Sequence, residues 1–193
     1  MGARSDGSSA RDAADSSDEA LAIRSRDGDL AAFESLARRH QERVYSYALR
    51  MTGSVHEAED ATQETLLRVF RSLGRFDPQQ PFAPWLFGIA AHVCRDALRR
   101  RGRRREEPSE AIEPAASGGD PREEAMAAEE RRRVRQAVRR LPRKYREVIV
   151  LHYAEDMGYE QVAAALGIRP DAARRRALRA RLMLQRYLGE RER

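Results

Sequence analysis

The stretch YEQVAAALGIRPDAARRRALRARLMLQRYL, residues 159–188, constrains the fold more than any other part of the chain. A short apolar helix is followed by Gly167, a residue type that readily takes the positive φ of a tight turn. Pro170 and Asp171 then suit the first turn of a second helix, because proline is tolerated there and an acid meets the positive end of the helix dipole. This order of residues predicts a helix-turn-helix.

The second of these helices has two contrasting faces. Its inner stripe consists of small and aliphatic residues, among them Ala173, Ala177 and Ala180. The outward side chains are arginines, namely Arg174, Arg175, Arg176, Arg179 and Arg181. Such a helix fits the major groove of DNA and its phosphates, so we predict a recognition helix. The alternative is a solvated amphipathic helix in a bundle.

Most of the remaining chain also repeats with the period of a helix, and no stretch alternates for long enough to predict a sheet. We expect helices over about 18–26, 29–52, 55–73, 83–101, 122–140, 142–154, 158–165 and 170–188. The expected fold is all-α, with two small helical domains at 18–105 and 122–193. Residues 1–17 are expected to be a disordered tail and residues 106–121 a flexible acidic linker.

Charge is distributed unevenly along the 193 residues, whose net charge is +6. Residues 30–105 carry 14 basic and 8 acidic side chains (+6), and residues 131–193 carry 18 and 7 (+11). Between them, residues 106–130 carry 1 basic and 9 acidic side chains (−8). Two basic blocks separated by an acidic spacer favour a polyanionic partner gripped in two places. An arginine-rich composition is equally typical of a GC-rich genome.

Residues 56–73 of the helix predicted at 55–73 have an inner face of Ala58, Thr62, Leu66, Val69, Phe70 and Leu73. On the opposite face a leucine lies in a polar, partly acidic stripe, formed by Asp60, Gln63, Glu64, Leu67 and Arg71. We call this set the Leu67 stripe below. It is either an ordinary solvated face or a protein-docking surface with Leu67 as its apolar centre.

The predicted helix that begins near Trp85 ends in six arginines among the seven residues 99–105. Its exposed line is basic and consists of Gly88, His92, Arg95 and Arg99, with Trp85 at its edge. An aromatic ring beside arginines can stack on an unpaired base while the arginines hold phosphates. Trp85 could equally be a core anchor, and Cys94 is most simply a small core residue.

Several classes of function lack support in the sequence. There is no Gly-rich phosphate loop, no paired carboxylates and no metal-ligand spacing, so we expect no catalytic site, no metal and no cofactor. No apolar run reaches about 18 residues, and no apolar signal-peptide core is visible. We therefore expect a cytoplasmic protein with no membrane insertion of its own.

Three stretches resemble the extracytoplasmic-function (ECF) group of bacterial RNA polymerase sigma factors. AEDATQETLLRVFRSLGRFDPQQPFAPWLFGIA (58–90) resembles sigma region 2, and LPRKYREVIVLHYAEDMGYEQVAAALGI (141–168) with RRALRAR (175–181) resembles sigma region 4. The resemblance covers most of residues 30–188. It implies an alternative sigma factor that binds core RNA polymerase and promoter DNA, with an anti-sigma factor as a further partner.

The resemblance also implies roles for individual residues. Core polymerase would dock on the Leu67 stripe. The −10 promoter element would be bound and opened by Phe76, Phe82, Trp85, His92, Arg95, Arg99 and Arg100, and the −35 element would be read by the arginines of the recognition helix. The chain departs from the family pattern at Gly88, Ala91 and His92 in the first block and at Ala172, Ala173 and Ala177 in the second. The rival hypothesis is a dimeric helix-turn-helix repressor or activator that binds duplex DNA alone.

Overall fold

The computed structural model describes residues 17–104 and 121–189, and these two ranges contain helices but no strand. The helices are α2 (Asp18–Arg26), α3 (Leu30–Thr52), α4 (Val55–Ser72), a 3-10 turn η1 (Leu73–Arg75), α5 (Phe82–Arg104), α6 (Pro121–Arg140), α7 (Arg143–Ile149), a π-helical turn η2 (Val150–Ala154), α8 (Tyr159–Leu166) and α9 (Pro170–Gly189). Except for Ser17 and Pro121, the predicted tail and linker lie outside the described residues.

Local chemistry sets several of the helix boundaries. The Asp29 side chain accepts a hydrogen bond from the Ala32 backbone N–H at 3.0 Å and caps the start of α3. Gly53, with φ of 75°, ends the same helix in the left-handed conformation that glycine adopts without strain. Ser54 then caps α4. One short segment therefore reverses the chain between α3 and α4.

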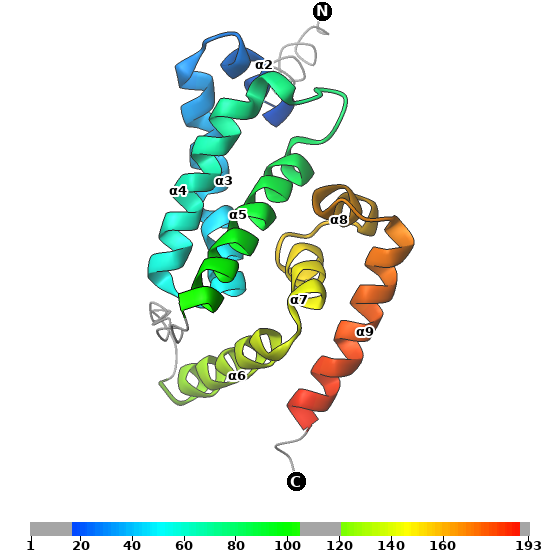
Figure 1. The fold of residues 1–193 in the computed structure, drawn as a ribbon. Helices are drawn as coiled ribbons and strands as arrows, with labels where there is room; N and C mark the ends of the chain where they lie inside the picture. Colours follow the sequence, from blue (N-terminus) through cyan, green and yellow to red (C-terminus); the bar gives the residue numbers. More distant parts are fainter. Residues whose placement is uncertain (1–16, 105–120, 190–193) are drawn as a thin grey trace, which may run out of the picture.

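Helices α2 to α5 form the first unit of the fold, residues 17–104 (Figure 1). Helices α3, α4 and α5 pack against one another, and α2 covers one end of the bundle. The fully buried centre consists of large apolar side chains, including Leu36, Val44, Tyr47, Met51, Leu86 and Phe87. Tyr47 and Phe87 meet edge to face, with ring centroids 5.6 Å apart.

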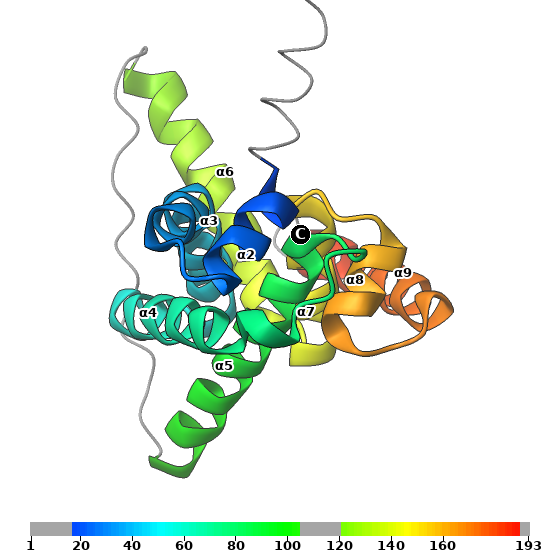
Figure 2. The same cartoon turned by 90° about the horizontal axis from the view of Figure 1, so that it is seen from above.

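Helices α6 to α9 form the second unit, residues 121–189, in which α9 packs on α7 and α8. Figures 1 and 2 both place α8 between α5 and α9. The two units share one apolar core, because Phe87 of α5 belongs to the same buried cluster as Val148, Leu151 and Val162. No pattern in the sequence had indicated this close packing.

The sequence-based helix boundaries agree closely with the structure, and the expected all-α class is confirmed. The segment expected as one helix over 142–154 differs in its geometry. It begins as α7 and widens into the π-helical turn η2, after which Asp156 takes a positive φ of 53°. Hydrophobic periodicity does not distinguish a π turn from α-helix over five residues.

Candidate nucleic-acid and protein interfaces

The Leu67 stripe lies on the outer side of α4. Asp60, Gln63, Leu67 and Arg71 are exposed or partly exposed, as is Glu64. Leu67 keeps 49% of its surface open to solvent. The Glu64 carboxylate accepts a hydrogen bond from Arg68 Nε at 2.6 Å, and Asp60 lies 3.2 Å from His56 Nδ1. The arrangement is an apolar side chain ringed by charges, as a docking surface requires.

The apolar part of this face is larger than the sequence indicated. Phe70 was expected in the core, but it is 43% exposed and its ring centroid lies 4.8 Å from that of Phe33 on α3. Thr65, fully buried, takes an inward position instead and satisfies its hydroxyl by donating to the Ala61 carbonyl at 2.6 Å. A threonine that bonds its own helix backbone can be buried at little cost, a possibility that a simple polarity pattern misses.

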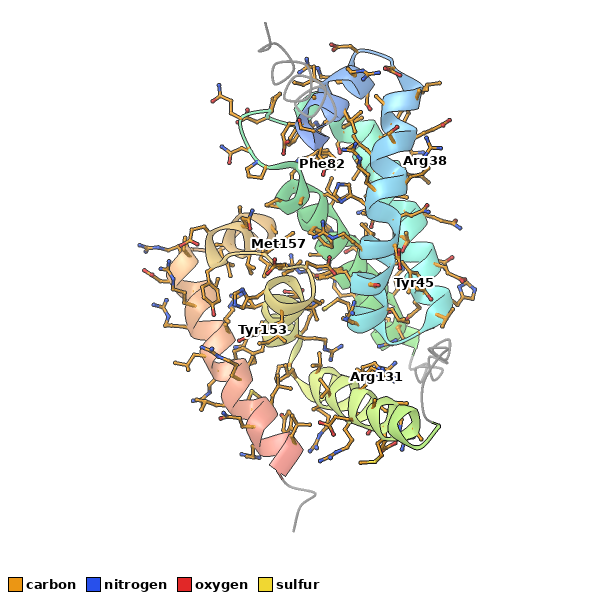
Figure 3. The ribbon with its side chains drawn as sticks, turned by 180° about the vertical axis from the view of Figure 1, so that it is seen from behind. Arg38, Tyr45, Phe82, Arg131, Tyr153 and Met157 are labelled. Atoms are coloured by element: carbon orange, nitrogen blue, oxygen red, sulfur yellow. The ribbon has the colours of Figure 1, made fainter. Side chains whose placement is uncertain are left out.

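Phe76, Phe82 and Trp85 form one aromatic cluster at the start of α5. Trp85 lies 5.1 Å from Phe76 and 5.7 Å from Phe82, measured between ring centroids. Phe76 and Phe82 are buried, whereas Trp85 is only partly covered. Phe82 also donates its backbone N–H to Glu19 of α2 at 2.9 Å, and Figure 3 places it at this end of the helix. In this arrangement the two phenylalanines support the Trp85 ring.

The basic line of α5 contains residues that stay at the surface of the first unit and one residue, Arg95, that the second unit binds. His92 and Arg99 are exposed and both contact Asp96, which Arg68 of α4 also approaches. The hydrogen bond from Arg99 is the main cause that lowers the pKa of Asp96. Arg100 is exposed as well. Arg95 differs from these residues, because its guanidinium binds a carboxylate of the second unit.

Cys94 behaves as the sequence indicated for a core residue. Its side chain is buried, and burial raises the pKa of its thiol to about 12. A thiol that stays protonated is a poor nucleophile and a poor metal ligand. The residue therefore contributes packing.

The predicted helix-turn-helix is formed by α8 and α9. Gly167 has the expected positive φ of 64°, and Ala173, Ala177 and Ala180 are completely buried against the scaffold. Arg175, Arg179 and Arg181 are exposed, and Arg176 is half-buried. Arg174 pairs with Glu160 of α8 and with Asp171. The exposed face of α9 is thus cationic along most of its length, and Arg174 also ties it to the preceding helix.

Three exposed apolar side chains lie on α9 and on the π-helical turn η2. A constant helical period over residues 141–157 predicts that Tyr153 packs in the scaffold beneath the helix-turn-helix, together with Leu141, Tyr145, Val148 and Ile149. Tyr153 is instead 58% exposed, because the π-helical turn changes the direction of the residues that it contains. Leu178 and Leu182 are exposed too. The Arg181 guanidinium lies 3.5 Å from the Tyr153 hydroxyl, which links η2 to this face of α9. Figure 3 shows Tyr153 on the second unit, well away from Tyr45 of α3.

The contact between the two units is the feature that sequence reasoning missed. Arg95 of α5 forms a forked ion pair with Glu147 of α7, with N–O distances of 2.7 and 3.2 Å. This pairing is the main cause that raises the pKa of Arg95. Arg146 of α7 donates to the Met51 carbonyl at 2.8 Å, and Arg139 of α6 donates to the Gly53 carbonyl. The two arginines satisfy carbonyls at the C-terminal end of α3, where a helix leaves its acceptors without partners.

Neither a metal cluster nor a membrane span is found in the part of the chain that the structure describes. Within 17–104 and 121–189 no group of three or more His, Cys, Asp or Glu side chains could hold a metal ion. In the same ranges no helix is both long enough and apolar enough to cross a bilayer.

Comparison with known proteins identifies the family. The model of sigma-70 region 2 matches residues 36–104, and that of sigma-70 region 4 matches residues 131–184. The RNA polymerase sigma factor CarQ of Myxococcus xanthus is 39% identical over 88% of this chain and 96% of its own length. The ECF RNA polymerase sigma factor SigE of Mycolicibacterium smegmatis is 38% identical over 84% of this chain and 65% of its own. The chain belongs to the ECF group of RNA polymerase sigma factors.

A solved structure extends this similarity to the arrangement of the whole sigma factor. It is the complex of the sigma factor RpoE with the anti-sigma factor NepR from Bartonella quintana. The present sigma factor is 26% identical to that chain, with a TM-score of 0.69 over 81% of its own length and 96% of the other chain. A match of this extent spans both units.

Proposed function

We propose that this sigma factor docks on core RNA polymerase through the Leu67 stripe, directs the enzyme to promoters through −10 and −35 elements, and helps to melt the −10 region. The order of its two sigma regions is the observation that carries the proposal. The exposed positions of Leu67 and Phe70 support the docking surface, because apolar side chains surrounded by charges are typical of protein-binding sites. A dimeric repressor receives no support from any of the comparisons.

The −10 element would meet α5 at its two kinds of side chain. His92, Arg99 and Arg100 would lie along the phosphates, and the partly exposed Trp85 ring would stack on a base released from the duplex. Charge attracts duplex and single strand alike, so the aromatic contact is what favours the melted state. Unstacking costs on the order of a few kcal/mol per step, which trapping of the released bases would offset without a nucleotide cofactor.

The −35 element would be read by the exposed face of α9. Arg175 and Arg179 lie one turn apart on that face, and no acidic side chain in the described ranges forms an ion pair with either of them. Each could form a forked pair with a guanine edge in the major groove. Arg174, Arg176 and Arg181 would supply phosphate contacts that fix the register.

Regulation would come from an anti-sigma factor, in the compartment where core polymerase acts, the cytoplasm. The similarity to a sigma factor solved with its anti-sigma factor supports this part of the proposal, since the match covers both halves of the chain. The protein would have no catalytic activity of its own and would act through the polymerase.

Reconstitution with purified core polymerase tests the proposal. The chain should co-elute with the core enzyme and should produce run-off transcripts from a subset of promoter fragments that the core enzyme alone ignores. A chain that fails to bind the core enzyme, but protects a palindromic duplex on its own, would favour the repressor hypothesis instead.

A further inference from the structure

Helix α8 of the second unit lies directly against α5, the helix proposed to bind the −10 element. The two helices lie close together at Gly88, where a Cβ atom added to the glycine would lie 3.0 Å from the backbone carbonyl oxygen of Ala165. That separation is tighter than an ordinary van der Waals contact, and a backbone carbonyl cannot move aside as a flexible side chain can. The absence of a side chain at position 88 is therefore what permits α8 to pack here.

Arg95 lies on the same face of α5, two turns beyond Gly88, and it is held by the second unit. Glu147 accepts both of its hydrogen bonds, at 2.7 and 3.2 Å, and the Glu147 side chain is only 4% exposed. A carboxylate bound in this forked manner presents two oxygens to the guanidinium, as a DNA phosphate does. Arg95 cannot hold Glu147 and a phosphate in this geometry at the same time.

A second ion pair, in which only the carboxylate is buried, closes the same contact from α3. The Glu155 side chain, 2% exposed, accepts a hydrogen bond from Arg43 Nε at 3.1 Å, and its backbone carbonyl accepts another from Arg43 Nη2 at 3.1 Å. In both of these ion pairs the first unit supplies the arginine and the second unit the glutamate. Glu147 and Glu155 would become accessible to water if the units separated, so breaking the contact leaves no buried charge without a partner.

We propose that the free sigma factor masks part of its own −10 surface, with α8 covering α5 at Gly88 and Glu147 occupying the position of a promoter phosphate on Arg95. The masking of DNA binding rests on the proposed function, whereas the closed arrangement of the two units does not. Promoter DNA exchanges one forked anionic partner of Arg95 for another, so it competes directly with closure. The glycine at position 88, which departs from the family pattern, is then explained by the packing of α8 against α5.

Competition between closure and DNA binding determines how much more tightly an open variant should bind DNA. If the open form accounts for about 10% of the free chain, a variant that is fully open binds single-stranded −10 DNA about tenfold more tightly. This gain in affinity needs no new contact with DNA, because the free-energy cost of opening no longer reduces the affinity of the variant.

Small-angle X-ray scattering of the full chain, without polymerase or DNA, tests closure. The test variant is Gly88→Gln, which introduces a neutral side chain at the contact. Gly102→Gln is its matched control, because it makes the same change on the same helix at a position where an added Cβ would have no neighbour within 4 Å. The wild type and the control should be compact, and Gly88→Gln should show a larger radius of gyration with unchanged helical circular dichroism.

A charge exchange tests the ion pair separately and remains informative if Gly88→Gln fails to fold. Glu147→Arg alone should open the chain, and adding Arg95→Glu should restore the compact form. An extended wild type would overturn the proposal, as would single variants that remain as compact as the wild type or a double variant that remains open.

Binding of a labelled single-stranded −10 oligonucleotide tests masking. Gly88→Gln should bind about tenfold more tightly than wild type and Gly102→Gln about equally. An open Gly88→Gln chain with unchanged affinity would overturn masking. Failure of the proposed function would look different, since closure would still be seen by scattering while reconstituted polymerase remained inactive with every variant.

Discussion

Leu67→Arg is expected to weaken docking to core polymerase while leaving the fold unchanged. Complete burial of a leucine side chain is worth about 1.5–3 kcal/mol. Leu67 is 49% exposed, so docking can bury only the open half, and truncation by Leu67→Ala should cost about 1 kcal/mol, or about fivefold in Kd. An arginine there must also be desolvated, which raises the expected cost to about 2 kcal/mol, or about thirtyfold.

Titration of fluorescently labelled protein with purified core polymerase measures both losses. Met126→Ala on α6 is the control, since it truncates another exposed apolar side chain outside the Leu67 stripe. All three variants should melt close to wild type, because changes at exposed positions usually alter stability by less than about 0.5 kcal/mol, which corresponds to about 2 °C or less for a chain of this size. A folded Leu67→Arg protein that binds core polymerase with wild-type Kd would refute the docking assignment.

Three further predictions concern the other surfaces. Arg175→Ala and Arg179→Ala should each cost about 1–3 kcal/mol at promoters with the preferred −35 sequence, measured by run-off transcription, whereas a uniform loss at all promoters with a shallower salt dependence would indicate phosphate contacts alone. Trp85→Ala should spare polymerase binding but impair promoter opening, and a template with a pre-melted −10 bubble should recover much of the activity; no recovery would contradict the stacking role. The pKa of Asp18 is lowered, chiefly by the hydrogen bond with His40, so Asp18→Asn should lower the Tm by about 2–4 °C at pH 5–7, and the difference should shrink as pH falls below the ordinary aspartate pKa, 3.8. A difference in Tm that is constant down to pH 3 would exclude this linkage.

Helix positions were predictable because their signals are local. The residues that start or end a helix include Asp29, Gly53, Gly167 and Pro170. Each acts within one turn of its own position, through a cap, a positive φ or the missing proline N–H. The exposure of Leu67 was also predictable, since a single helix wheel decides it. These features depend on neighbours three or four residues away, which a sequence displays directly.

Errors arose where tertiary contacts decide burial. Phe70 was assigned to the core, but it packs on Phe33 of another helix and keeps 43% of its surface open. Tyr153 was assigned to the scaffold, but the π-helical turn redirects it to solvent. A helix wheel assumes a constant pitch and includes no partner helix. It therefore predicts neither the packing of Phe70 on another helix nor the change in direction at Tyr153.

The contact between the units was the least predictable feature. Arg95 and Glu147 are 52 residues apart, and nothing in the local pattern of either helix indicates the other. Gly88 departs from the family pattern at the point of contact, but that departure does not by itself identify the partner helix. Its meaning emerges only when α8 is placed against it.

Permanganate footprinting of an active promoter tests the central claim most directly, because it reports unpaired thymines without depending on the later steps of transcription. With core polymerase and this sigma factor, thymines near the −10 element should become reactive. They should stay protected with core polymerase alone, and their reactivity should fall sharply with Leu67→Arg at limiting protein. Protected thymines with the wild-type holoenzyme would contradict the account, as would melting that persists without the sigma factor.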